Sequence, residues 1–245
     1  MPAILSLLVM LSIGALTASR VPGDAEKDVI HTQGGDLEIT FLGHGTLMLR
    51  YQGKNIHIDP WSRVADYGTL PKADLILVTH HHGDHLDVGA IDAVRTKQTI
   101  VLMTQECSTK VAEGVVIRNG ESRDVAGITV TAVPAYNLVH VRDSGEPFHP
   151  KGQGNGYIMD FAGTKVYVAG DTENTPEMKA LKMIDVAFLP MNLPYTMTPE
   201  MVADAVKAFR PRILYPYHYG ETDISKLLDL LKDVEGVEVR VRNMK

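Results

Sequence analysis

The feature that most constrains this chain is the stretch of residues 79–87, which reads THHHGDHLD. It follows the apolar run ADLILV at residues 73–78, which has the length and composition of a buried strand in a central sheet. Such a strand delivers four histidines and an aspartate to a loop at its C-terminal end, the edge of an open α/β sheet where ligands generally bind. Several imidazoles crowded on one loop cost desolvation and mutual repulsion unless a cation binds them. The loop therefore predicts a metal site.

The spacing within this loop indicates two directions of ligation. His80 and His82 are two residues apart, so in extended backbone their side chains leave on the same side and converge on one ion. Asp84 and His85 follow Gly83, which lets the chain reverse and turn them towards a second point. Nitrogen-rich ligation with one hard carboxylate suits zinc, and also manganese or iron, better than calcium or magnesium.

Length and charge narrow the class of protein. The 245 residues, 44% of them hydrophobic, are enough for one substantial α/β domain. A formal net charge of -6 gives no support for binding to a polyanion, so we expect no nucleic-acid partner. Cys107 is the single cysteine, which excludes a disulfide within the chain.

The N-terminus has the pattern of a secretory signal peptide. Residues 3–16 are apolar and are followed by the small residues Thr17, Ala18 and Ser19, although no Lys or Arg precedes the run. The run is shorter than the roughly 20 apolar residues of a spanning helix, so we expect no stable membrane insertion after cleavage. We expect a signal peptide at 1–19, a linker at 20–35, a domain at 36–245, and a periplasmic or secreted protein.

The rest of the chain alternates between strand and helix patterns. Alternating or continuous apolar runs predict strands at 37–41, 47–51, 55–59, 99–103, 127–133, 156–161, 165–169, 184–190, 212–216 and 237–241. Capped amphipathic segments predict helices at 87–94, 198–209 and 223–232. This order indicates an α/β protein in which two sheets are covered by helices on their outer faces.

The order His80-x-His82-x-Asp84-His85 resembles the signature of the metallo-β-lactamase superfamily of binuclear metal-dependent hydrolases. Other segments that resemble the superfamily follow in the expected order: FLGHGTLMLR at 41–50, IDP at 58–60, GDT at 170–172 and PYHYG at 216–220. The detailed likeness is to the branch with ascorbate-6-phosphate lactonase-like and N-acyl-phosphatidylethanolamine phospholipase D-like enzymes. The resemblance implies a four-layer αββα sandwich and two divalent metal ions, with zinc first and manganese or iron as alternatives.

The resemblance also implies a role for each site residue. Asp59 would lie behind the metal loop and orient a ligand histidine, and Asp171 would bridge the two metals. The first metal would be held by His80, His82 and Asp171, and the second by Asp84, His85, Asp171 and His218. His44 would line the wall of the catalytic site.

One position departs from the superfamily pattern. Asn137 stands where a histidine often supplies the third nitrogen ligand of the first metal. An amide binds zinc weakly, so the first site is either incomplete or completed by another residue. His149, in the segment HPKG, is favoured slightly for this place, whereas His140 reads as a solvated loop histidine.

The implied chemistry is hydrolysis by a metal-activated hydroxide, because a bound metal lowers the pKa of water to about 7. The substrate would be a lactone, ester or phosphodiester of a small molecule. Asp84 could accept a proton during catalysis, but we assign it chiefly a ligand role. Two alternatives remain: a phosphodiesterase of lipid or nucleic acid, and a non-catalytic metal-binding module. The sequence leaves the oligomeric state open.

Overall fold

The computed structural model describes residues 25–245. Its strands are β1 (Lys27–Thr32), β2 (Gly35–Gly43), β3 (Thr46–Tyr51), β4 (Lys54–Ile58), β5 (Leu75–Leu77), β6 (Ile100–Met103), β7 (Val115–Val116), β8 (Ser122–Val125), β9 (Ile128–Ala135), β10 (Gly154–Phe161), β11 (Thr164–Val168), β12 (Val186–Pro190), β13 (Ile213–Tyr217) and β14 (Glu238–Val239). Its α-helices are α1 (Val88–Val94), α2 (Pro176–Lys179), α3 (Pro199–Phe209) and α4 (Ile224–Leu231), and a short 3₁₀ turn covers Cys107–Thr109.

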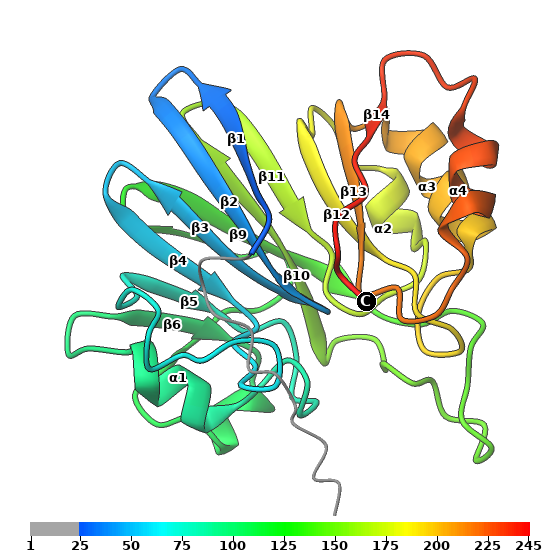
Figure 1. Ribbon diagram of the computed structural model, residues 1–245. Helices are drawn as coiled ribbons and strands as arrows, with labels where there is room; N and C mark the ends of the chain where they lie inside the picture. The colour runs from blue at the N-terminus through cyan, green and yellow to red at the C-terminus, as the bar shows by residue number, and fades with distance from the viewer. Residues whose placement is uncertain (1–24) are drawn as a thin grey trace, which may run out of the picture.

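The strands form two seven-stranded sheets that pack face to face, with α1 outside one sheet and α2, α3 and α4 outside the other (Figure 1). This confirms the predicted four-layer αββα sandwich. The sheets have matching topologies, since β1 to β4 and β8 to β11 pair antiparallel, whereas β4 to β7 and β11 to β14 pair parallel. The carboxyl ends of the parallel strands meet at one edge of the sandwich, where loops from both halves gather.

The apolar faces of the two sheets form the main core. Phe188 and Tyr215 stack with ring centroids 4.9 Å apart, and Phe41 from the opposite sheet lies 5.1 Å from Tyr215. A second core lies under α1, where Ile91 and Val94 are fully buried. Burial on both faces explains why β5 and β12 read as continuous apolar runs.

The helix ends follow the predicted capping. Asp87 and Thr198 accept hydrogen bonds from the backbone N–H groups of Ala90 and Met201, at the starts of α1 and α3. Each cap satisfies a backbone donor that the helix leaves unpaired, and so fixes where the preceding loop ends. The ends of the loops that precede α1 and α3 are therefore fixed.

The predicted linker at 20–35 is wrong, because Lys27–Thr32 forms β1 and pairs along its full length with β2. Asp28 lies 2.8 Å from the guanidinium of Arg242, which ties this edge strand to the end of the chain. The expected signal peptide at 1–19 lies outside the described residues. Within residues 25–245, no helix is long and apolar enough to cross a bilayer.

Candidate metal centre

The histidine loop leaves β5 and is anchored by a buried carboxylate at the end of β4. Asp59 Oδ1 accepts a hydrogen bond from the backbone N–H of Thr79 at 2.7 Å, and its Oδ2 accepts one from the Thr79 hydroxyl at 2.6 Å. His85 Nδ1 lies 2.8 Å from Asp59 Oδ2, and both side chains are completely buried. Donation from Nδ1 leaves the lone pair of His85 Nε2 directed into the site. Asp59 thus lies behind the loop and orients His85.

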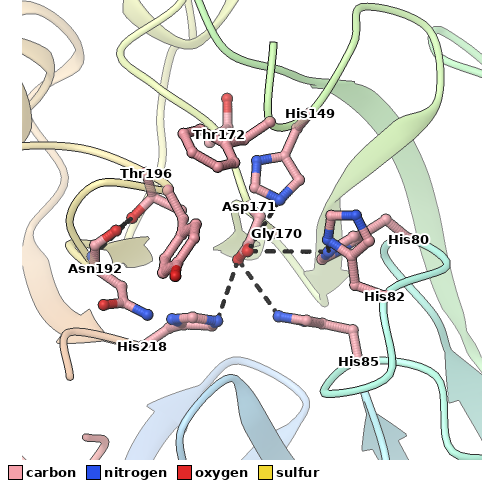
Figure 2. Close-up of polar contacts among 12 residues, drawn as sticks. His80, His82, His85, His149, Gly170, Asp171, Thr172, Asn192, Thr196 and His218 are labelled. Carbon is pink, nitrogen blue, oxygen red and sulfur yellow. Dashed lines mark hydrogen bonds and ion pairs between the residues drawn. The ribbon is translucent and has the colours of Figure 1, made fainter. Parts of the chain in front are cut away.

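Three imidazoles form the first donor cluster. His80, His82 and His149 each place a ring nitrogen within 4.8 Å of the other two. His80 and His82 come from the loop after β5, whereas His149 comes from the long connection between β9 and β10. Figure 2 shows the rings of His80, His82 and His149 converging from these two segments.

The second donor cluster contains His44, Asp84, His85 and His218, whose ligand atoms also lie within 4.8 Å of one another. Asp84 Oδ2 lies 3.5 Å from His218 Nε2 and 3.6 Å from His85 Nε2. The rings of His44 and His218 lie in contact, tilted by 40° with centroids 3.7 Å apart, and His44 Nε2 lies 3.0 Å from Asp84 Oδ2. His44 therefore packs directly against the second cluster.

Asp171 lies between the two clusters, where β11 ends. Its Oδ1 is 3.5 Å from His85 Nε2 and 3.6 Å from His218 Nε2. Its Oδ2 is 3.3 Å from His149 Nε2 and 3.9 Å from His80 Nε2. One carboxylate thus presents one oxygen to each cluster, as the dashed lines from Asp171 show in Figure 2.

A glycine lets the β2–β3 turn approach the second cluster. A Cβ atom on Gly45 would lie 2.8 Å from His85 Cε1 and 3.4 Å from His218 Cδ2. The backbone N–H of His218 also donates to the His44 carbonyl at 3.0 Å. Only a residue without a side chain fits at position 45.

The buried polar atoms at the centre suit a cation. Within residues 25–245, His85 Nε2, His218 Nε2 and Asp171 Oδ1 are buried and have no hydrogen-bond partner. Unpaired buried polar atoms are costly, and a shared metal ion would satisfy all three. Imidazole nitrogens with two carboxylates are a donor set for zinc, manganese or iron. The residues present therefore fit bound divalent metals.

The site's electrostatics also suit a cation. Burial and neighbouring imidazoles lower the pKa of His80 well below its usual value and lower that of His82 to about 4, so both rings are neutral, the form that ligates metals. Burial would lower the pKa of His85 too, but Asp171, Asp59 and Asp84 raise it to about 10, so these carboxylates favour a positive charge at Nε2, which a bound metal would supply in place of a proton. Although burial opposes it, His218 and His85 hold the pKa of Asp171 well below its usual value.

Asn137 is not placed as a metal ligand, which corrects that alternative. Its Oδ1 accepts hydrogen bonds from the backbone N–H of His149 at 2.9 Å and from His149 Nδ1 at 2.7 Å. Its Nδ2 donates to Glu173 Oε1 at 3.1 Å. The amide has no oxygen free for a metal, and the structure places His149 beside His80 and His82 instead.

His140 is not a solvated loop histidine, because its Nδ1 lies 2.7 Å from Glu173 Oε1. Glu173 has a fully buried side chain and was not among the residues singled out from the sequence. Its position two residues after Asp171 was the available signal, but the sequence does not reveal which loop its carboxylate contacts. Burial opposes the shift, yet hydrogen bonds from His140, Asn137 and Leu138 hold the pKa of Glu173 below its usual value.

Comparison with known proteins agrees with this geometry. Residues 38–218 match a family model described as a beta-lactamase superfamily domain, and this range includes every donor residue above. The chain belongs to the metallo-β-lactamase superfamily of metal-dependent hydrolases.

The similar proteins carry the same description. The chain is 32% identical to a UPF0173 metal-dependent hydrolase from Methanopyrus kandleri over 195 residues, which are 75% of this chain and 84% of the relative. A crystal structure described as a metal-dependent hydrolase from Parabacteroides distasonis superposes with a TM-score of 0.86 at 49% identity, covering 90% of this chain and all of that one. Igni18, a metallo hydrolase from Ignicoccus hospitalis, superposes with a TM-score of 0.69 at 26% identity, covering 84% of this chain and 94% of that one.

Proposed function

We propose that this protein is a binuclear hydrolase. The observation that carries the proposal is the placement of Asp171, which presents one oxygen to each donor cluster. His80, His82, His149 and Asp171 would hold the first ion, and Asp84, His85, Asp171 and His218 would hold the second. Zinc is the first choice for both sites, with manganese or iron as alternatives.

The chemistry that such a pair supplies is a hydroxide at neutral pH, since metal binding lowers the pKa of water to about 7. The chain's own residues keep the site organised around it. Asp59 holds the His85 ring, and His44 Nε2 contacts Asp84 Oδ2, the oxygen that faces the second cluster. This arrangement suits a lactone, an ester or a phosphodiester, because hydroxide attack can cleave any of the three.

A groove beside His44 supports a small-molecule substrate. Its volume is about 1000 Å³, at the upper end of the range for small-molecule sites. Arg63 and Lys245 lie on its walls, together with Ser62 and Tyr67. Asp66 also lies on these walls, and Lys245 is 3.4 Å from Glu221, so Arg63 is the cation that favours a substrate with an anionic group, such as a phosphate or a carboxylate.

The test is metal analysis of the purified protein together with hydrolysis of a generic lactone, a carboxylic ester and a phosphodiester. We expect two divalent ions per chain and turnover of at least one substrate class. His82→Ala and Asp171→Ala should each abolish hydrolysis and leave the chain folded by circular dichroism. A single ion and no turnover of any substrate would favour a non-catalytic metal-binding module.

A second candidate, a phosphodiesterase of lipids, is favoured by an exposed apolar surface beside the first cluster. Five apolar side chains, on the β9–β10 loop that carries His149 and on the loop between β12 and α3, are between 42% and 64% exposed: Leu138, Val139, Val141, Leu193 and Tyr195. The two loops touch, because the ring of Phe148 packs on that of Tyr195 at 5.1 Å. Exposed apolar clusters of this kind commonly mark binding surfaces.

Comparing hydrolysis of a soluble short-chain phosphodiester with that of a phospholipid in vesicles separates the two candidates. A Leu138→Ser/Val139→Ser variant is the probe, and Met183→Ser is the control, since Met183 is an exposed apolar residue outside both loops. A lipid substrate predicts that the probe variant loses vesicle hydrolysis relative to soluble hydrolysis. An unchanged ratio in both variants would favour the small-molecule assignment.

A further inference from the structure

A buried carboxylate organises the start of the loop between β9 and β10. Glu173 Oε2 accepts hydrogen bonds from the backbone N–H groups of Leu138 at 2.6 Å and Val139 at 2.7 Å. Its Oε1 accepts from the backbone N–H of His140 at 2.8 Å and from Asn137 Nδ2 at 3.1 Å. Four donors on one fully buried carboxylate fix this turn of backbone strongly, because hydrogen bonds to a charged group are the strong ones.

Asn137 passes this constraint on to His149. The backbone N–H of Asn137 donates to the His149 carbonyl at 2.9 Å. The side-chain oxygen of Asn137 accepts hydrogen bonds from the backbone N–H and from Nδ1 of His149. The intervening residues therefore form a loop that is closed at its base. These hydrogen bonds at the base hold both the backbone and the ring of His149.

An amide is the side chain that position 137 requires. Its oxygen faces two donors, the N–H and Nδ1 of His149, whereas its nitrogen faces two acceptors, Glu173 Oε1 and the Tyr195 carbonyl. An aspartate would set a second carboxylate against Glu173, and an aliphatic residue would leave both sides unpaired. Because the Asn137 oxygen accepts a hydrogen bond from Nδ1–H of His149, it also fixes the tautomer of that ring. The lone pair of His149 Nε2 then points to the first cluster.

We propose that Glu173 and Asn137 are a positioning pair that holds His149 as the third nitrogen ligand of the first metal. The proposal rests on the proposed function in assigning a metal to His80, His82 and His149. Neither Glu173 nor Asn137 touches the metal. Their contribution is to fix the direction and the tautomer of one ligand ring.

The first test measures metal affinity by chelator competition for each of the two ions. In metal sites, removal of a residue that orients a ligand weakens binding by about 10- to 100-fold. We expect Asn137→Ala to weaken the binding of one ion by that factor and to leave the affinity for the other unchanged. Glu173→Gln should weaken the binding of the same ion. Asn174→Ala and Glu177→Gln are the matched controls, because each removes a hydrogen bond or charge outside the clusters and should change neither affinity.

The second test reads the His149 tautomer by ¹⁵N NMR of the metal-free protein, which needs neither metal nor turnover. We expect the Nδ1–H form in the wild type and a mixture of tautomers in Asn137→Ala, which removes the acceptor. Unchanged tautomer and unchanged affinities in Asn137→Ala would overturn the positioning role. If His149→Ala keeps both ions while Asn137→Ala alters the tautomer, the ligand set of the proposed function fails, and what stands is that Asn137 orients the His149 ring.

Discussion

Replacing His57 should remove one contribution to the protein's sensitivity to acid. His57 lies on β4, is fully buried, and donates from Nε2 to the Pro71 carbonyl at 3.0 Å. Burial lowers its pKa from 6.5 to about 4, although the hydrogen bond to Pro71 raises it slightly. The ring is therefore neutral in the folded protein at a pH where it is protonated in the unfolded chain.

The sign and size of the effect follow from linkage. The unfolded chain binds the additional proton between about pH 6.5 and 4, so the free energy of unfolding falls as the pH is lowered through this window. Each pKa unit is worth about 1.4 kcal/mol, so the wild type loses about 1.4 kcal/mol by pH 5.5 and about 2.6 kcal/mol by pH 4.5 from this one residue. His57→Gln keeps a donor for Pro71 and does not titrate.

The assay is urea unfolding of the metal-free wild type and of His57→Gln at about pH 8, 5.5 and 4.5. At high pH we expect the variant to be less stable, because it loses packing of the ring against Tyr67, whose centroid is 6.0 Å away. The deficit should shrink by about 1.4 kcal/mol at pH 5.5 and by about 2.6 kcal/mol at pH 4.5. A difference that stays constant across these pH values would refute the assigned burial of a neutral ring.

Three further predictions concern the metal centre and the N-terminus. Gly45→Ala should lower metal affinity and turnover at least tenfold, because the new methyl group would lie 2.8 Å from His85 Cε1; affinity for the second ion, measured by chelator competition, checks this. Removing the metals should lower the melting temperature, since ions that bind only the folded state add about 2.7 kcal/mol at 100 times their Kd; a calorimetric scan with and without chelator measures the difference. We propose that the protein is exported, so N-terminal sequencing should find the mature chain beginning after Ser19 or a nearby small residue, whereas an intact Met1 in a membrane fraction would indicate an anchor.

Strands and helices with strong local patterns could be predicted from the sequence. The buried run before the histidine loop formed β5, and the Thr198–Pro199 start of α3 appeared where the capping residues predicted it. β1 was missed because Ile30 is the one fully buried side chain in its six residues, so the strand has no clear periodicity. Its place is set partly by Asp28 and Arg242, which are 214 residues apart.

The donor residues could be proposed because each follows the end of a strand, and parallel strands bring their carboxyl ends to one edge. Their exact partners could not be proposed, because pairing across the edge depends on loop paths. Glu173 shows the limit most clearly. Its sequence neighbours indicate proximity to Asp171, whereas its hydrogen bonds go to backbone 33 to 35 residues earlier in the chain.

Position 137 shows how a departure from a family pattern can leave the chemistry intact. Read alone, an amide at a ligand position predicts a weakened first site. The backbones of Asn137 and His149 are hydrogen-bonded to each other, so a ring carried by either residue would lie near His80 and His82. The chain places the ring on the later residue and uses the earlier one to hold it. The first cluster consequently keeps three nitrogen donors. Asn137 contributes by orienting the ring of His149.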